Sequence, residues 1–253
     1  MTTESEIELE ADLEDDSPLR KLLAGVDRAR KLTVWSLLAL AVGTSLSWNW
    51  SQEIFEVLSR PLTAALALRG QDPRLAFTGL TDPFVLYFTV SLSTGLVFAI
   101  PALALQLYVV VAPRIRLRSA ITIAAFVLSA CALFLAGLGF AYFILIPFAV
   151  SYLLDVGKEF THAITIRDFL RFTVRLLLAM GLGAQLPLII LSAARVGLIN
   201  ARGLLRWFPY AILVAFVIAA MLTPPDGMSQ FLVAVPLLAL YLVGVVVAAI
   251  AGR

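Results

Sequence analysis

Six long stretches of this chain contain no charged residue, and this pattern limits its fold more than any other feature. About 20 consecutive apolar residues, wound as an α-helix, span the ~30 Å hydrocarbon core of a bilayer. A β-barrel would instead show short alternating segments. A soluble fold would have to bury six fully apolar helices. The pattern therefore predicts an all-α integral membrane protein with six transmembrane helices. The charge-free stretches are 32–52, 83–113, 119–154, 176–194, 207–225 and 227–252.

Composition supports this class. Hydrophobic residues make up 61% of the chain and charged residues 14%, against about half and about 25% in a typical soluble domain. The predicted organisation is an acidic, disordered tail over 1–18 and one membrane domain over 19–253. The expected transmembrane helices of that domain are about 32–50, 83–112, 119–154, 169–196, 207–222 and 231–250.

The basic residues predict the orientation of these helices. Positive side chains favour the cytoplasmic side of a membrane when they lie in short loops. The chain has 19 Lys and Arg residues. Twelve lie before the first helix, between the second and third, around the loop between the fourth and fifth, or at the end of the chain, and five lie in the opposite loops. We therefore expect a multi-pass protein of the cell membrane with both termini in the cytoplasm.

Helix lengths and prolines predict the shape of the bundle. The stretch 119–154 is longer than a bilayer needs, so we expect it to tilt, kink at Pro147 or project. The stretch 207–222 would be short for a bilayer. A surface helix is expected near 52–58. Prolines lie within four different spans, and each bends its helix, which predicts a cupped bundle. These prolines are Pro101, Pro147, Pro187 and Pro236.

Several classes of chemistry are excluded by what the chain lacks. Its only histidine, His162, falls in a predicted loop, and its only cysteine, Cys131, lies in an apolar stretch. No Ser/His/Asp set or phosphate-binding glycine-rich motif is present. The net charge of +2 carries no nucleic-acid signature. We therefore expect a protein that is not an enzyme, holds no cofactor or metal, and does not bind nucleic acid.

The polar residues within the spans are few. Gln106, Gln185 and Gln230 are the largest, and an amide in hydrocarbon needs a protein or water partner. For Gln106 and Gln230 a helix–helix hydrogen bond and a functional role are equally open. Gln185 precedes Pro187, which frees backbone carbonyls, so we expect it to line a wet concavity. Arg171 and Arg175 share one helical face. Arg171 can reach the outer interface, and Arg175 needs headgroups or a wet cavity.

Two clusters of residues resemble the TatC family, the large subunit of the twin-arginine protein translocase. The first is Met221-Leu222-Thr223-Pro224-Pro225-Asp226 with Ser229-Gln230. The second is Phe140-Ala141-Tyr142-Phe143 with Pro147-Phe148. The resemblance covers about residues 19–250, in the family's order and spacing. Weaker matches are Leu58 with Pro61-Leu62, Thr81-Asp82-Pro83-Phe84, Pro101 with Gln106, and Ala112-Pro113.

The resemblance implies a function. TatC proteins receive folded precursors that carry a twin-arginine signal peptide and move them across the membrane with small single-span partners of the TatA and TatB type. The proton-motive force drives this transport. By resemblance, we expect a homo- or hetero-oligomer whose signal-peptide and partner contacts include Phe84, Pro101, Thr223, Pro224, Asp226 and Gln230, together with Asp27, Ser119 and Gln185.

Those last three positions depart from the family pattern. Family members usually carry a glutamate just before the first helix, where this chain offers only Asp27. They carry another in the first inside loop, where this chain has Ser119, and a third in the fourth helix, where it has Gln185. Two alternatives to a working TatC subunit therefore stay open. One is a diverged TatC-fold paralogue with weak or lost twin-arginine recognition, and the other is a small-solute transporter.

Overall fold

The computed structural model describes residues 18–70, 79–115, 119–157, 165–223 and 226–251, with the backbone alone in 18–32 and 109–115. These residues are helical almost throughout, which confirms that the protein is all-α. Five helical segments are long and apolar enough to cross a membrane, and the part of the first helix at Thr33–Trp48 is a shorter apolar helix. The elements are α2 (Pro18–Trp48), α3 (Ser51–Ala67), α4 (Asp82–Ile115), α5 (Ala120–Phe140), the π-helical η1 (Ala141–Leu145), α6 (Ile146–Val156), α7 (Ile166–Gly183), α8 (Leu186–Arg195), α9 (Ala201–Leu222) and α10 (Gly227–Ala251).

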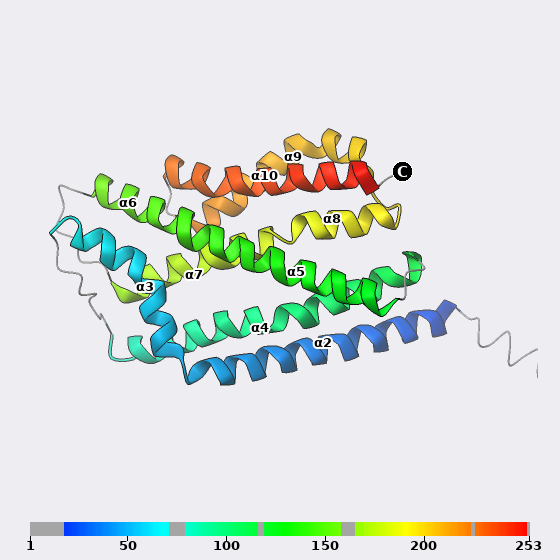
Figure 1. The fold of residues 1–253 in the computed structure, drawn as a ribbon, viewed down its shortest axis with the longest axis horizontal. Coiled ribbons are helices and arrows are strands. Elements are labelled where there is room, and N and C mark those ends of the chain that lie inside the picture. The colour runs from blue at the N-terminus through cyan, green and yellow to red at the C-terminus, as the bar shows by residue number, and fades with distance from the viewer. Residues whose placement is uncertain (1–17, 71–78, 116–118, 158–164, 224–225, 252–253) are drawn as a thin grey trace, which may run out of the picture.

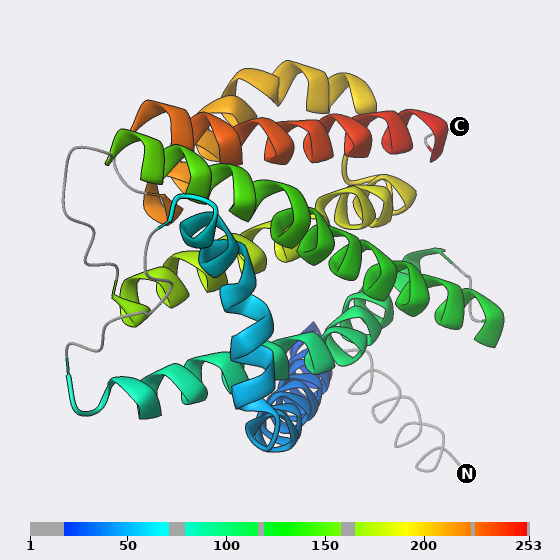
Figure 2. The same cartoon turned by 60° about the vertical axis from the view of Figure 1, so that its left-hand side comes forward.

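The long helices run side by side along the molecule (Figure 1). Helices α2 and α4 form one side and α9 and α10 the other, with α5 and α7 between them. Helix α3 runs across the bundle at one end, as Figure 2 shows. We call this the α3 end. The start of α2 and the finish of α10 both lie at the opposite end, which we call the terminal end (Figure 1).

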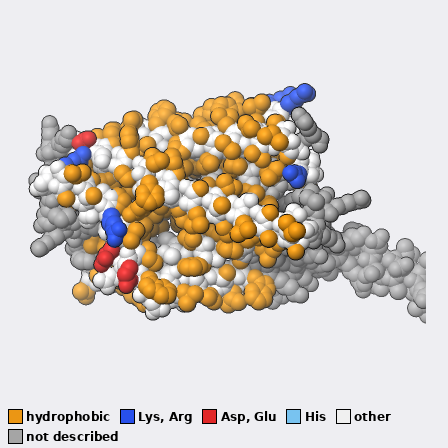
Figure 3. Space-filling view, viewed as in Figure 1, with side chains coloured by type: hydrophobic (Ala, Val, Ile, Leu, Met, Phe, Trp, Pro, Cys, Tyr) orange, Lys and Arg blue, Asp and Glu red, His pale blue; other side chains and the backbone are white. Residues whose placement is uncertain are grey.

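The outer surface matches the spacing of charges in the sequence. Side chains on the face in Figure 3 are hydrophobic along the middle of the molecule, and the charged ones gather toward its two ends. Many large apolar side chains are exposed, among them Leu128, Phe143, Leu213 and Val246. Such a band would be unstable in water and is what a surface in contact with lipid tails requires.

Glycines allow the helices to approach closely. A Cβ at Gly95 of α4 would lie 2.3 Å from Thr44 Oγ1 of α2. A Cβ at Gly137 of α5 would lie 2.4 Å from the Met180 carbonyl oxygen of α7. In lipid, where apolar burial does not drive helices together, such close contact between backbones supplies much of the attraction. The two glycines therefore set the spacing of α2 against α4 and of α5 against α7.

The best-buried core lies where α5, η1, α7 and α10 meet. Leu145, Leu176, Met180 and Val233 are each at most 1% exposed and belong to one packed cluster. These side chains come from η1, α7 and α10, which are distant from one another in the sequence. The cluster holds α7 in the centre of the bundle, with other helices around it.

The third predicted helix, 119–154, is a continuous helical segment formed by α5, η1 and α6, with a local defect at η1. The π-helical turn η1 directly precedes α6, in which Pro147 occupies the first turn. A proline has no N–H to donate and its ring clashes with the preceding turn. A single π-turn is a common way to absorb such a defect within a long helix. The defect lies beside Pro147, where a kink was one of the predicted outcomes.

The fourth predicted helix, 169–196, is interrupted and forms two helices, α7 and α8. Helix α7 ends at Gly183 and α8 begins at Leu186. Pro187 lies in the first turn of α8 and cannot donate a backbone hydrogen bond. Gln185 occupies the break between the two helices, and its N–H donates to the Leu182 carbonyl oxygen at 3.0 Å.

Three boundaries need correction. Helix α2 begins at Pro18 and not near residue 32, because it continues upstream through the basic residues that bound the apolar stretch. Helix α9 has 22 residues and starts at Ala201, so it is about 33 Å long and is not the short helix predicted at 207–222. The Asn200 side chain caps it by accepting a hydrogen bond from Gly203 N, and the first turns include Arg202 and Arg206, whose charges had ended the apolar stretch. The surface helix near 52–58 is also longer, because α3 continues through Pro61 to Ala67.

Candidate functional site

The three glutamines within the spans all make contacts between helices. Gln106 of α4 donates to Ser36 Oγ of α2. Gln230 Nε2 of α10 donates to the Phe216 carbonyl oxygen of α9 at 2.9 Å. Gln185 Nε2 donates to the Ala130 carbonyl oxygen of α5 at 2.9 Å. Each amide therefore makes a hydrogen bond that joins two helices in an apolar surrounding.

Gln185 lies at the break between α7 and α8. The break turns the chain so that the amide meets α5, and the side chain remains partly exposed. Its hydrogen bond accounts for the helix–helix role, while the partial exposure leaves the amide oxygen free to face water or a partner. A glutamine stays neutral, so this position can polarise its surroundings without titrating. The predicted wet concavity stays a prediction.

The turn between α9 and α10 is built from the strongest of the family motifs. Thr223 ends α9 by donating its hydroxyl to the Ala219 carbonyl oxygen at 2.9 Å. Asp226 caps the start of α10, because its Oδ1 accepts from Ser229 N at 2.7 Å. Gln230, one turn later, reaches back to α9. The motif therefore closes a helical hairpin, with Pro224 outside the described residues.

Large apolar side chains surround this turn. Met221, Met228 and Phe231 are all exposed. The Phe231 ring lies edge-on to Phe216 at 4.9 Å between centroids. Among the described residues, Asp226 Oδ2 and Ser229 Oγ of the turn are buried without a hydrogen-bond partner. The outer surface of the hairpin is apolar and open to lipid or to another helix.

Phe84 and Pro101 both lie on α4 with exposed side chains, at different depths. Phe84 is near the start of α4, and its ring centroid lies 5.9 Å from that of Trp48 and 6.3 Å from that of Phe88. Asp82, at the first position of α4, is 2% exposed and pairs with Arg167 of α7. The start of α4 therefore anchors α7 and presents an aromatic surface beside it.

Two of the predicted contact residues, Asp27 and Ser119, lie toward the terminal end. Asp27 falls within α2, in the part described by backbone alone. Ser119 is exposed and caps α5, its Oγ accepting from Ile121 N at 3.3 Å. A serine is well suited to this position, since it satisfies a free N–H of the first turn. A carboxylate at 119 would have to serve as the cap as well as bind a ligand.

Arg171 and Arg175 line a groove of about 250 Å³ between α4 and α7. Both side chains are exposed. The sequence placed them correctly on one face of their helix. It did not show that Arg167 and Asp82 join them on the groove wall.

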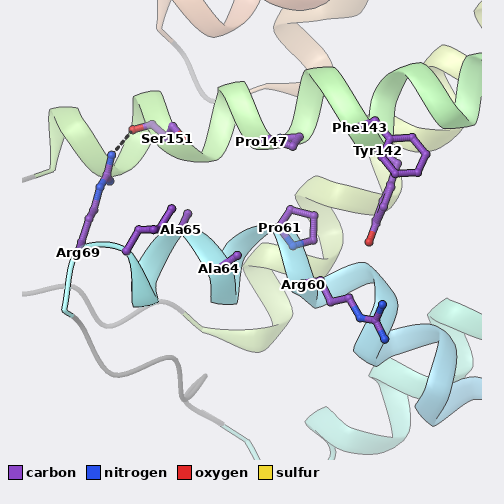
Figure 4. A pocket seen from close by; sticks show the side chains of 10 residues that line it. Arg60, Pro61, Ala64, Ala65, Arg69, Tyr142, Phe143, Pro147 and Ser151 are labelled. Carbon is purple, nitrogen blue, oxygen red and sulfur yellow. Dashed lines mark hydrogen bonds between the residues drawn. The ribbon is translucent and has the colours of Figure 1, made fainter.

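A second cavity, of about 440 Å³, was not predicted (Figure 4). It lies between α3 and the segment η1–α6, with Pro61 on one wall and Phe143 and Pro147 on the other. Tyr142 joins the two walls by donating its hydroxyl to the Val57 carbonyl oxygen at 2.7 Å. The two walls contain two of the family motifs, the one at Pro61 and the one at Phe143 and Pro147. The presence of both motifs in the sequence was the signal that could have predicted this cavity.

The far end of this cavity is held by an arginine. Arg69 donates to the Ser151 carbonyl oxygen at 3.1 Å, as Figure 4 shows, and to Asp155 at 2.8 Å. These bonds tie the end of α3 to α6. Among the described residues no group of three or more His, Cys, Asp or Glu side chains is placed to hold a metal ion.

The chain matches known proteins in sequence and in fold. The family model for TatC, the Sec-independent protein translocase protein, matches residues 26–236. A TatC protein of Desulforapulum autotrophicum is 32% identical over 241 residues, 95% of this chain and 87% of that protein. One from Koribacter versatilis is 30% identical over 227 residues, 89% of this chain and 84% of that protein.

A solved structure gives the same result. The crystal structure of a twin-arginine translocase receptor TatC superposes with a TM-score of 0.81 at 26% identity, covering 90% of this chain and 99% of that one. The relatives in sequence and in structure agree over nearly the whole length of the molecule. The chain therefore belongs to the TatC family of Sec-independent protein translocase proteins.

Proposed function

We propose that this chain is the receptor subunit of a twin-arginine translocase. It receives folded precursors that carry a twin-arginine signal peptide and assembles with single-span TatA- and TatB-type partners, in an oligomer driven by the proton-motive force. It works as a membrane component and not as an enzyme. The observation that carries this proposal is the family match across residues 26–236 together with the same fold.

The proposed topology has six crossings, with both termini in the cytoplasm. It is supported by the twelve-to-five distribution of basic residues and by the start of α2 and the finish of α10 lying at one end. With Cys131→Ser as background, Arg116→Cys should resist a membrane-impermeant thiol reagent added outside, and Asp72→Cys should react. Labelling of position 116 together with protection of position 72 would show that the orientation is the opposite of the one proposed.

The hairpin of α9 and α10 is the proposed partner surface. Its polar groups, Thr223, Asp226 and Gln230, bond within the hairpin. Its apolar side chains at Met221 and Phe231 are exposed. A single-span partner helix in the membrane presents the same apolar chemistry. Such a helix can pack against this surface without breaking any of those bonds.

The signal-peptide site is proposed at the terminal end. Two arginines need carboxylates for bidentate, charge-assisted pairing, and this end offers Asp27 and the uncharged Ser119. We expect weak, salt-sensitive binding of twin-arginine peptides, reduced by Asp27→Asn or deletion of the acidic tail. Ser119→Glu should strengthen it. Tight, salt-resistant discrimination between paired-arginine and paired-lysine peptides, unchanged by Asp27→Asn, would place recognition elsewhere.

The decisive test is export of a folded twin-arginine reporter in cells that lack their own TatC. Export that depends on the paired arginines of the reporter supports the proposal. The cap at Ser119 favours the second candidate, a TatC-fold paralogue that assembles with partners but recognises signal peptides poorly. That candidate predicts co-purification with single-span partners without export. Solute flux through the purified chain alone would instead support a transporter.

A further inference from the structure

The groove between α4 and α7 has two chemically different parts. One part is apolar and is lined by Val85 and Leu86 of α4 and by Leu170 and Val174 of α7. The other part carries three guanidinium groups from one helix, those of Arg167, Arg171 and Arg175. Because these arginines are four residues apart, they form a row along one face of α7.

The nearby carboxylates, Asp82 and Asp168, reduce the charge of this row but leave three arginines against two aspartates, so the row stays positive. Asp82 pairs with Arg167, and its other oxygen accepts from Gly79 N at 2.8 Å. Asp168, one turn before Arg171, accepts the Thr165 hydroxyl at 2.7 Å. Among the described residues, neither Arg171 nor Arg175 has an ion pair or hydrogen bond. Two guanidinium groups of the groove are therefore available to an anion.

Helix geometry adds to the positive potential. Helices α4 and α7 both begin at the α3 end, at Asp82 and Ile166. The first turn of a helix carries a partial positive charge. Thr89, on the groove wall, donates its hydroxyl to the Val85 carbonyl oxygen at 2.7 Å. It adds no negative charge.

The depth of the row fits the level of lipid phosphates. No charged residue lies between Arg175 and Arg195. The segment between them is helical on both sides of the α7–α8 break, and twenty residues of such a segment cover roughly 30 Å, about the thickness of the hydrocarbon core. Arg195 near one boundary therefore puts Arg175 near the other. Arg171 lies about 6 Å farther out, at the level of the headgroups.

We propose that this groove binds one anionic phospholipid. Its phosphate pairs with Arg171 and Arg175, and one acyl chain lies along the apolar wall at Val85, which is exposed, whereas Leu86, Leu170 and Val174 form the buried base of the groove. Arginine suits this role, because its planar fork pairs with two phosphate oxygens at once. A soluble phosphate would use the same guanidinium groups but would gain nothing from the apolar wall.

The test compares lipid binding by the full chain and by two double variants. The first is Arg171→Gln with Arg175→Gln. The matched control is Arg202→Gln with Arg206→Gln, which removes the same charge at the same spacing from α9, where both arginines are exposed. Binding of phosphatidylglycerol and of phosphatidylcholine to protein in detergent is titrated by native mass spectrometry. Thermal unfolding checks that all three proteins are folded.

We expect the wild-type protein to retain one phosphatidylglycerol in preference to phosphatidylcholine. The Arg171/Arg175 variant should bind phosphatidylglycerol at least about tenfold more weakly, and the Arg202/Arg206 control should change by less than about twofold. Equal losses in both variants, or no loss in the first, would overturn the proposal. Competition by millimolar inorganic phosphate or glycerol 1-phosphate as effective as by the lipid would assign the groove to a soluble anion.

Discussion

Two apolar spans of equal mean hydropathy are buried to very different extents in this protein. In the span formed by α7 and α8, 50% of the most apolar stretch is buried inside the protein, and in α9 the share is 11%. Their mean hydropathies are alike, at 2.0 for both. The first span is surrounded by α4, α5 and α10, and the second packs mainly on α10. Hydropathy alone therefore distinguishes a membrane helix from a soluble one, but not a central helix from a peripheral one.

The difference has a functional meaning. The central span carries Gln185, the pair of Arg167 with Asp82, and the two free arginines. The peripheral span presents exposed Leu213, Val217 and other apolar side chains. We infer that α7–α8 organises the bundle, whereas α9 is free to contact lipid or a partner helix.

The largest expected effect comes from separating α7 from α5. Gly137→Leu places a side chain where a Cβ already lies 2.4 Å from the Met180 carbonyl oxygen. Backbone cannot move aside as a side-chain tip can, so we expect a loss of about 3 kcal/mol in unfolding free energy, or failure to fold. Gly139→Leu is the matched control, because nothing lies within 4 Å of its Cβ position. Denaturation in detergent measures both, and equal stability would show that α7 is not tightly held.

A smaller effect is expected where α7 is anchored to α4. Asp82→Ala removes a buried carboxylate that pairs with Arg167 and accepts from Gly79 N, so we expect a cost of about 2 kcal/mol. Asp155→Ala, which breaks the more exposed pair with Arg69, should cost under about 1 kcal/mol. The two unfolding curves are compared directly. An equal shift would mean that burial of the first pair contributes nothing.

Gln185 and Gln230 each connect one of the two spans to a neighbouring helix by a hydrogen bond, so removing each amide compares the stability contributed by that bond. Gln185→Leu removes the bond from the α7–α8 break to α5, and Gln230→Leu removes the bond from α10 to α9. Each should lower stability by about 0.6 kcal/mol or slightly more. We expect Gln185→Leu also to impair partner assembly, measured by co-purification. If folding and assembly both stay unchanged, the amide at 185 is only a tolerated polar residue.

The smallest expected effect on stability concerns the exposed face of α9. Leu213→Ala combined with Val217→Ala should change the unfolding free energy by less than about 0.5 kcal/mol, as surface substitutions usually do. Association with a single-span partner, measured by crosslinking, should nevertheless weaken. A loss of stability comparable to that of Gly137→Leu would contradict the peripheral position of α9.

Local pattern accounts for much of the fold. Charge-free stretches of membrane length identified the helical segments, because an apolar helix in lipid needs no knowledge of its neighbours to form. Pro147 and Pro187 marked the positions of the π-turn and of the α7–α8 break, since a proline disrupts its helix wherever that helix packs. Charges were a poorer guide to boundaries: α9 continues through Arg206 because Asn200 caps it upstream.

The sequence by itself determined that this is a helical membrane protein of the TatC family and which polar residues its spans contain. Only the tertiary structure decided what those residues meet. Gln185 bonds to Ala130, 55 residues away, Asp82 pairs with Arg167, and Pro61 shares a cavity with Pro147. Helix formation depends on neighbours along the chain, whereas these contacts depend on the close approach of helices that glycines such as Gly137 permit.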